Sequence, residues 1–338
     1  MFVGNNGLIG KKAPELARVG RWINSAPLRL GYDLRGRLVL LAFWTSTDPT
    51  SLRALPVLNA WHRQYGQLGL AVIGVHVPDF EFERRSEVIS RCLAAYGVAF
   101  PVLLDNQSRT AHAFSCECRP SFYLVDARGI VRHVQAGEGE YFATERLIRE
   151  LLEETGTPPP EPLLVSPEGA AVRFYPTPRL YCGYVRGLIG NGPDEAQGHA
   201  TAYTDSGDYE EGRIYLQGVW IQEQECVRHA RQTAAPVDYL AVRYRAYEVQ
   251  AVMGSSDGYP LQVLVSWDGV ALPPSLAGRD VAVVGDESRV TVAEPRLYEL
   301  VADVAFGSHV LRLATDSERL QAYALDFGGR PRATSPGR

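Results

Sequence analysis

The sequence predicts two domains of different fold class, an α/β domain followed by an all-β antiparallel sandwich. Strand and helix patterns alternate between residues 38 and 155, whereas short β-rich runs separated by turn residues follow from residue 212 onward. A proline-rich segment lies between them. Because 338 residues exceed one compact domain of common size, we expect two separate hydrophobic cores.

The first domain begins with a buried strand and an amphipathic helix. Residues 38–44 are an unbroken apolar run of strand length, which is typical of a parallel strand buried on both faces. Apolar residues then recur at three-residue steps over residues 51–65, which predicts a helix with a kink at Pro56.

The same alternation continues and then changes to an antiparallel hairpin. We expect strands at 70–77 and 100–104, helices at 86–96 and 110–114, a hairpin of strands 121–125 and 130–135, and a last helix at 144–155 that Thr144 caps. Parallel strands joined by helices, followed by a hairpin and a covering helix, predict a thioredoxin-type layered sheet.

A proline-rich linker separates this domain from the β-rich one. Four prolines between residues 156 and 162 fix φ and remove hydrogen-bond donors. The predicted organisation is a thioredoxin-like domain at 10–156, a linker at 157–163, a β-sandwich at 164–330 and a disordered tail at 331–338. The sandwich strands are expected at 212–220, 239–253, 261–267, 281–284, 289–292, 296–301, 308–314 and 320–326.

Composition and charge narrow the classes of function. A net charge of -5 without clustered Lys and Arg argues against nucleic acid as a partner. No apolar run approaches the roughly 20 residues that span a bilayer, and the first residues do not resemble a signal peptide. Five irregularly spaced cysteines fit a reducing compartment, so we expect a cytoplasmic protein. The histidines lack zinc-type spacing, and neither a phosphate loop nor a dinucleotide fingerprint occurs, so we expect no metal and no cofactor.

The junction of the first strand and its helix is where a thioredoxin fold places its reactive group, since the helix dipole stabilises a thiolate there. Here it reads Phe43-Trp44-Thr45-Ser46-Thr47-Asp48-Pro49-Thr50-Ser51, with Pro56 five residues further on. This motif resembles the TlpA/DipZ branch of thioredoxin-like proteins, the redoxins, in which Phe-Trp precedes Cys-x-x-Cys and a later Pro. The alignment puts Asp48 and Ser51 at the two cysteine positions. Further landmarks of the resemblance are residues 74–80, 105–106, Pro120 and 137–141.

The missing cysteines exclude the usual dithiol reaction at this site, because a carboxylate cannot replace an attacking thiolate. The preferred interpretation is that Asp48, Thr50 and Ser51 cap the helix. The alternative is that Asp48 holds a substrate or a metal.

The resemblance also predicts a peptide groove. Pro120 matches the proline that this fold holds in cis, so we expect a cis Arg119-Pro120 bond and a groove formed by Trp44, Asp48, Ser51, Asp79, Arg119 and Pro120. Asp79 falls where ResA-like relatives carry a proton-handling acid. A solvated carboxylate is the preferred interpretation of Asp79.

Cys116 and Cys118 are the one pair that could restore redox activity. Only Glu117 separates them, so a disulfide between them would be strained and labile. The preferred interpretation is two incidental thiols.

The second half resembles the carbohydrate-binding-module-like sandwich of DipZ-type proteins, through residues 181–184, 216–220, 267–269, 296–301 and 323–328. Tyr215, Trp220 and Trp267 are candidates for a sugar-stacking platform, although core packing is the preferred interpretation for each of them.

Three hypotheses follow. The leading one is a redox-degenerate thioredoxin-like protein that binds a peptide, protein or glycan without dithiol catalysis. The second is a divergent thiol-disulfide oxidoreductase that uses Cys116 and Cys118. The third is a glycan-binding protein in which the thioredoxin fold is only a scaffold.

Overall fold

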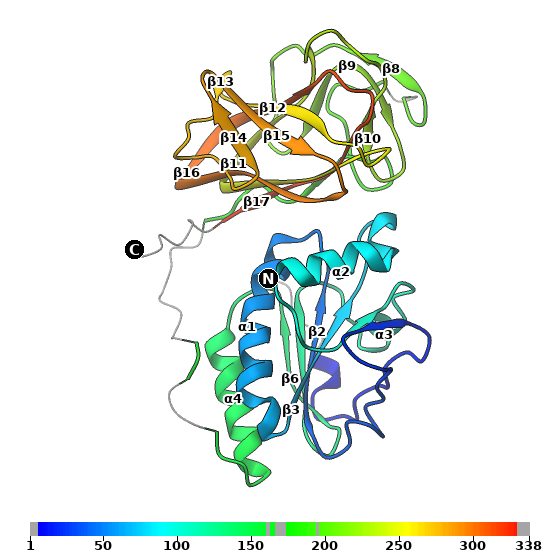
Figure 1. The fold of residues 1–338 in the computed structure, drawn as a ribbon, viewed down its shortest axis with the longest axis vertical. Helices are drawn as coiled ribbons and strands as arrows, with labels where there is room; N and C mark the ends of the chain where they lie inside the picture. Colours follow the sequence, from blue (N-terminus) through cyan, green and yellow to red (C-terminus); the bar gives the residue numbers. More distant parts are fainter. Residues whose placement is uncertain (1–5, 160–162, 166–173, 194–195, 330–338) are drawn as a thin grey trace. The chain divides into compact units, whose positions relative to one another are not determined.

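A computed structural model of the chain describes residues 6–159, 163–165, 174–193 and 196–329 (Figure 1). The chain divides into two units, Met1–Ala171 and Val172–Arg338, each with its own sheet. The predicted tail at 331–338 and residues 160–162 of the predicted linker lie outside the described residues.

The first unit is an α/β layer structure around one mixed sheet. Its central strand pairs in parallel with the strand that follows helix α1 and antiparallel with the hairpin. In spatial order the strands are β1 (Arg21–Ile23), β4 (Val102–Leu104), β3 (Leu70–His76), β2 (Leu38–Trp44), β5 (Ser121–Val125) and β6 (Val131–Ala136). Every residue of β2 is buried, as the unbroken apolar run predicts for a strand covered on both faces.

Helices cover both faces of this sheet. They are α1 (Pro49–Tyr65), α2 (Ser86–Ala95), α3 (Arg109–Ala113) and α4 (Tyr141–Glu154), with 3-10 turns η1 (Asn6–Leu8), η2 (Gly66–Leu68) and η3 (Glu81–Arg84). Helices α1 and α4 lie side by side, and the rings of Trp61 and Tyr141 meet edge to face at 6.2 Å (Figure 1). On the opposite face Phe43 of β2 packs with Phe114, just after α3, and with Tyr123.

The expected elements of this unit are all present, with two differences in detail. Helix α1 starts two residues before the predicted Ser51 and continues through Pro56 without a break in helical structure. The prediction that Thr144 caps the last helix is wrong. Left-handed backbone at Gly139 and Glu140 turns the chain earlier, so α4 begins at Tyr141, and the buried Thr144 hydroxyl donates to Gln135 Oε1 at 2.8 Å.

The first residues after the predicted linker are attached to the first unit. The main-chain N–H groups of Leu164 and Val165 each donate to the buried carboxylate of Glu145 on α4, at 2.8 Å. The Tyr65 hydroxyl of α1 donates to the same carboxylate. Residues 164 and 165 therefore pack with the first unit, and the second unit starts later than the sequence boundary at residue 164.

The second unit is an antiparallel β-sandwich with no α-helix among its described residues. Two long strands, β11 (Asp238–Ser255) and β16 (Arg296–Thr315), pair along most of their length. The remaining strands are β7 (Leu180–Tyr181), β8 (Ala200–Tyr203), β9 (Ile214–Gln222), β10 (Val227–His229), β12 (Leu261–Trp267), β13 (Val270–Ala271), β14 (Val281–Val284), β15 (Glu287–Val292) and β17 (Leu320–Gly328).

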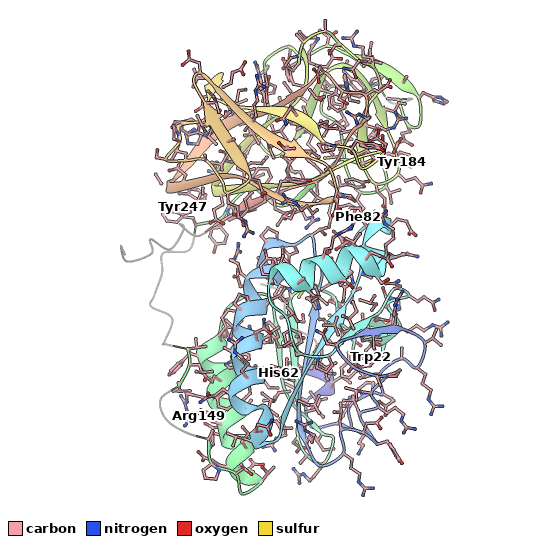
Figure 2. The ribbon with its side chains drawn as sticks, viewed as in Figure 1. Trp22, His62, Phe82, Arg149, Tyr184 and Tyr247 are labelled. Carbon is pink, nitrogen blue, oxygen red and sulfur yellow. The ribbon has the colours of Figure 1, made fainter. Side chains whose placement is uncertain are left out.

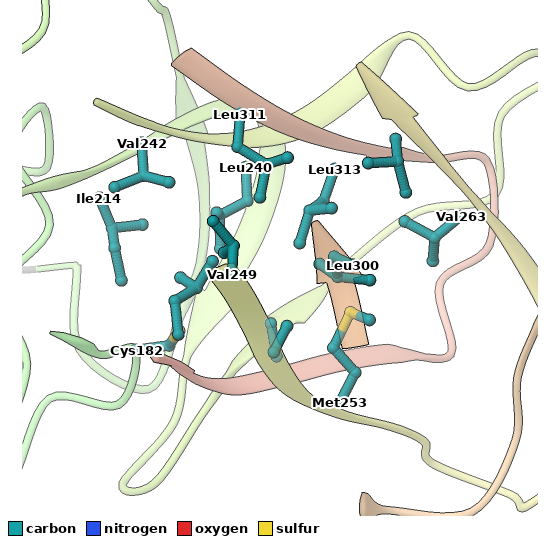
Figure 3. Packing of buried hydrophobic residues seen from close by; sticks show 14 of the residues in the cluster. Cys182, Ile214, Leu240, Val242, Val249, Met253, Val263, Leu300, Leu311 and Leu313 are labelled. Carbon is teal, nitrogen blue, oxygen red and sulfur yellow. The ribbon is translucent and has the colours of Figure 1, made fainter. Parts of the chain in front are cut away.

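The strand network encloses one apolar core. Strand β11 pairs with β9 at its start and with β17 at its end, while β10 joins β9 to β17. Figure 3 shows Val242, Leu311 and Ile214, from β11, β16 and β9, converging in this core. The two predicted strands at 296–301 and 308–314 are one continuous strand, β16, which carries extra residues between Ala302 and Gly307 and pairs with β11 on both sides of this irregularity, at Glu248 and at Ala246.

A buried carboxylate fixes the start of β11. Asp238 accepts hydrogen bonds from Arg231 at 2.7 Å through both carboxylate oxygens and lies 2.8 Å from His229 Nε2. Burial alone would raise the pKa of Asp238, but the hydrogen bonds from Arg231 and His229 outweigh it and lower the pKa to about 2. The carboxylate fits only because residue 218 is glycine: a Cβ there would overlap it.

We predict that Gly218→Ala destabilises the second unit by about 3 kcal/mol or more, because the added methyl group displaces a buried, paired carboxylate. Chemical denaturation measures the change. Gly258→Ala is the matched control, since Gly258 also has a positive φ but nothing lies within 4 Å of the added Cβ. The control should lose only the backbone cost of about 1 kcal/mol. Equal losses in the two variants would contradict the role given to Asp238.

Candidate functional site

The loop between β2 and α1 is the predicted reactive position of the first unit. Asp48 is the N-cap of α1, with extended backbone at φ -109 and ψ 120. Its carboxylate accepts from the main-chain N–H groups of Thr50 at 3.2 Å and Ser51 at 2.9 Å, and from the Thr50 hydroxyl at 2.6 Å. The carboxylate thus satisfies donors that an uncapped helix leaves free.

Ser51, which the resemblance aligns with the second cysteine, is fully buried. Its hydroxyl donates to Asp48 Oδ2 at 2.8 Å and accepts from the main-chain N–H of Thr45 at 3.4 Å. The two positions that a dithiol would occupy are therefore joined by a hydrogen bond within the cap. Neither side chain supplies a sulfur nucleophile.

Glu83 of η3 accepts hydrogen bonds from this loop. This residue was not among those predicted from the sequence. The side chain is fully buried. Its Oε1 accepts from the Thr45 hydroxyl at 2.8 Å and from the N–H and hydroxyl of Ser46 at 3.0 and 2.6 Å. Its Oε2 accepts from the Thr47 hydroxyl at 3.3 Å and from the N–H groups of Asp79 and Phe80 at 2.7 and 3.0 Å. One carboxylate thereby joins the β2–α1 loop to the turn after β3.

A buried histidine completes this network. His76, at the end of β3, is fully buried with Nε2 3.6 Å from Glu83 Oε1, and its ring packs edge-on against Trp44 at 5.0 Å. Burial alone would raise the pKa of Glu83, but His76 and the hydroxyls of Ser46 and Thr45 lower it to about 2. Glu83 is therefore ionised at neutral pH.

The structure places Asp79 differently from the acid that the resemblance suggested. Asp79 is half-buried, and its main-chain N–H donates to Glu83. The carboxylate that contacts the loop is that of Glu83, four residues later. A sequence signal for it existed, because the polar run Thr45-Ser46-Thr47 follows a fully buried strand and so needs buried acceptors.

Cys116 and Cys118 are both free and partly buried. Cys116 Sγ donates to the main-chain oxygen of Cys118 at 3.3 Å, and Cys118 Sγ lies 3.5 Å from the Ser121 hydroxyl. Burial raises the pKa of the Cys116 thiol to about 11. Because burial disfavours the thiolate, Cys116 is a poor nucleophile.

The Arg119-Pro120 peptide bond is cis, as predicted. The Pro120 oxygen accepts from the N–H of Gly137 at 2.8 Å. Within the described ranges, the N–H and C=O of Arg119 have no hydrogen-bond partner. The main-chain N–H and C=O of Arg119, next to the cis bond, are therefore available to donate and accept one hydrogen bond each.

A surface ion pair ties the first turns of α1 to the loop before α4. Arg53 donates to Glu138 through Nε at 2.7 Å and through Nη2 at 2.8 Å. This two-bonded geometry is the stronger form of an arginine–carboxylate contact. It links the helix that Asp48 caps to the segment whose Gly137 N–H donates to the Pro120 oxygen.

The aromatic platform suggested for the second unit does not form. Trp220 is fully buried, and its indole N–H donates to the main-chain oxygen of Gln217 at 2.8 Å; Tyr215 is also buried. Trp267 is half-buried, and its ring lies against His309 at 4.1 Å. These aromatic side chains pack inside the domain and are not exposed, because a sandwich must fill its interior with large side chains.

The described residues contain neither a metal-binding cluster nor a membrane-spanning helix. No group of three or more His, Cys, Asp or Glu side chains is arranged to hold a metal ion. Likewise, in the part of the chain that the structure describes, no helix has both the length and the apolarity to cross a membrane.

Comparison with known families defines the class of each unit. Residues 9–134 match the family model of the AhpC/TSA family, and residues 177–328 match that of the thioredoxin-like C-terminal domain. The chain therefore carries an AhpC/TSA-type redoxin domain followed by a thioredoxin-like C-terminal domain.

More particularly, the chain is homologous to DipZ. It is 31% identical to the Mycobacterium tuberculosis protein DipZ over 279 residues, which cover 75% of this chain and 38% of that protein. It is 29% identical to the thiol-disulfide oxidoreductase YkuV of Bacillus subtilis over 143 residues, 42% of this chain and 95% of YkuV. A solved structure of a DsbE-like protein from Chlorobium tepidum has 25% identity and a TM-score of 0.38, covering 43% of this chain and 97% of that one. The chain thus spans about two fifths of the length of the DipZ proteins it matches.

We predict that Glu83 makes the first unit sensitive to acid. Because its pKa is lowered from 4.5 to about 2 on folding, the stabilisation is complete above pH 4.5 and is lost as the pH falls toward 2. The loss amounts to roughly 3 kcal/mol. Glu83→Gln should cost about 3–5 kcal/mol at pH 7, since it leaves buried donors without a carboxylate.

Urea unfolding at pH 7, 4 and 3 measures this effect. The difference in unfolding free energy between wild type and Glu83→Gln should shrink as the pH falls. Glu153→Gln, at an exposed position of α4, should differ little from wild type at every pH. A Glu83→Gln difference that stays constant with pH would refute the assignment.

Proposed function

We propose that the first unit does not exchange disulfides and instead binds an extended polypeptide segment beside Arg119 and Pro120. The observation that carries this proposal is the cap of α1. Asp48 and Ser51 stand where the family's cysteines stand, and both side chains are bonded to each other and to the helix. The chain keeps the fold of a family that includes thiol-disulfide oxidoreductases, while the reactive position serves to stabilise the helix.

The neighbouring thiols give little support to a relocated dithiol. Cys116 is held as a neutral thiol by burial, which raises its pKa to about 11. Its Sγ is directed to the main-chain oxygen of Cys118 rather than to the other sulfur. Oxidoreductase activity through Cys116 and Cys118 is therefore the alternative that the experiment must exclude.

The free main chain of Arg119 supports polypeptide binding. An extended peptide that adds as a strand needs one unpaired N–H and one unpaired C=O from its host. Arg119 supplies both, within a segment fixed at Pro120 by the N–H of Gly137. The second unit is not proposed as a sugar platform, because Trp220 and Tyr215 are buried.

The redox part of the proposal predicts the outcome of an insulin reduction assay with dithiothreitol. The wild-type chain and a Cys116→Ser/Cys118→Ser variant should both stay at the dithiothreitol background. Asp48→Cys/Ser51→Cys should accelerate the reaction, because it returns two thiols to a helix N-terminus. Asp48→Ala/Ser51→Ala is the control without thiols and should remain at background.

Wild-type turnover that disappears in the Cys116→Ser/Cys118→Ser variant would overturn the proposal and identify these cysteines as the active pair. Turnover by the wild-type chain is enough to overturn the proposal, whatever the folding of the variant, and the variant serves to assign that turnover to Cys116 and Cys118.

The binding part is tested by NMR on the full chain with a reduced, alkylated polypeptide as the probe. We expect saturable shifts of the Arg119 and Ser121 amide signals with the unfolded probe and none with the same polypeptide folded. Saturable shifts elsewhere, with Arg119 unchanged, would contradict strand addition at this edge.

A further inference from the structure

A cavity of about 570 Å³ lies at the end of the first unit opposite Asp48. It is formed by the last turn of α1, the start of β3 and the loop that precedes β2. Its wall includes His62, Arg63 and Arg37, together with apolar side chains such as Leu34 and Leu70. Fourteen residues of helix separate Asp48 from His62, which is roughly 21 Å at 1.5 Å per residue, so the cavity is distinct from the proposed peptide site.

Its volume and lining are those of a small-molecule site. Ligand cavities usually measure about 300–1,000 Å³ and combine apolar walls with a few polar groups. Arg37 is held in place, because its Nη2 donates to the main-chain oxygens of Gly66 at 3.2 Å and Leu70 at 2.9 Å. One wall of the cavity therefore carries a guanidinium with a fixed position.

Arg63 provides a second positive charge at the cavity. It forms no hydrogen bond or ion pair with any residue that the structure describes. The one carboxylate among the lining residues, that of Asp33, accepts from Arg29 at 2.9 and 3.1 Å and so is already neutralised. The balance of charge at the cavity is positive.

His62 adds a third polar group (Figure 2). Its Nδ1 is buried and has no hydrogen-bond partner in the described part of the chain, which leaves Nε2 as the ring nitrogen open to a ligand. Burial, followed by the charges of Arg37 and Arg63, lowers the pKa of His62. A neutral imidazole beside two guanidinium groups can donate a hydrogen bond to an acceptor without adding charge repulsion.

We infer that this cavity binds a small anion with an apolar body, a carboxylate or a phosphate ester, whose charged group contacts Arg63, Arg37 and His62. The apolar part of the ligand contacts Leu28 and Pro101, two apolar lining residues that are only partly buried. Arginine binds both carboxylates and phosphates through two parallel hydrogen bonds, which fixes the charged end of the ligand toward the rim.

The test is an NMR titration of the full chain with hexanoate, hexyl phosphate and hexylammonium at constant ionic strength. We expect saturable shifts of the amide signals of Gly66 and Leu70 with one or both anions and none with the cation. Saturation by hexanoate alone would identify a carboxylate site, and saturation by hexyl phosphate alone a phosphate-ester site.

Arg63→Ala should weaken binding of the better anion about tenfold or more, since it removes a charge-assisted hydrogen bond. Arg109→Ala is the matched control, because Arg109 is an exposed arginine on α3, away from the cavity lining. The inference is wrong if neither anion saturates, if hexylammonium binds equally well, or if the two variants bind the anion with the same affinity.

Discussion

The carboxylate of Glu83 is the interaction on which the candidate site depends. It is fully buried, and a buried ionised group persists only when surrounding donors replace its hydration. Those donors come from two segments far apart in sequence, the loop at residues 45–47 and the turn at residues 79–80. These hydrogen bonds therefore fix the positions of the end of β2, the start of α1 and the end of β3 relative to one another.

Helix α1 has a charged side chain at each of its ends. Its N-terminus receives a carboxylate, Asp48, and its C-terminal end receives the guanidinium of Arg37 at the Gly66 oxygen. Both placements match the helix dipole, which favours negative charge at the first turn and positive charge at the last. The two candidate binding regions of the unit lie at the two ends of this one helix, so each region has a rigid support.

Much of the fold follows from sequence patterns because those patterns record burial. The apolar run of β2 and the three-residue period of α1 predicted both elements, and the motif at residue 120 predicted the cis bond. Strand β1 escaped prediction because three residues carry no period, and only pairing with β4 makes them a strand.

The site was less predictable than the fold, because its polar contacts join residues distant in the chain. Glu83 lies in a charged stretch, 81–85, that resembles a solvated surface, and only the three-dimensional contacts reveal it as fully buried. Trp220 shows a different case, because core packing was the preferred interpretation and the residue is fully buried. Its aromatic ring is compatible with either a sugar platform or a core position. The sequence around it does not show which strands pack over it in the folded sheet.

The hydrogen bond between Ser51 and Asp48 contributes to the stability of the folded state, whereas a thiolate at a helix N-terminus contributes to reactivity. A thiolate at a helix N-terminus gains activity from the helix dipole but makes weaker hydrogen bonds to the first turn than a carboxylate does. A fold that holds such a thiolate accepts a less stable native state in return for reactivity. Under the proposed function, an oxygen cap in that place leaves the same electrostatic field to act on folding alone, and this position is released from the trade-off between stability and activity.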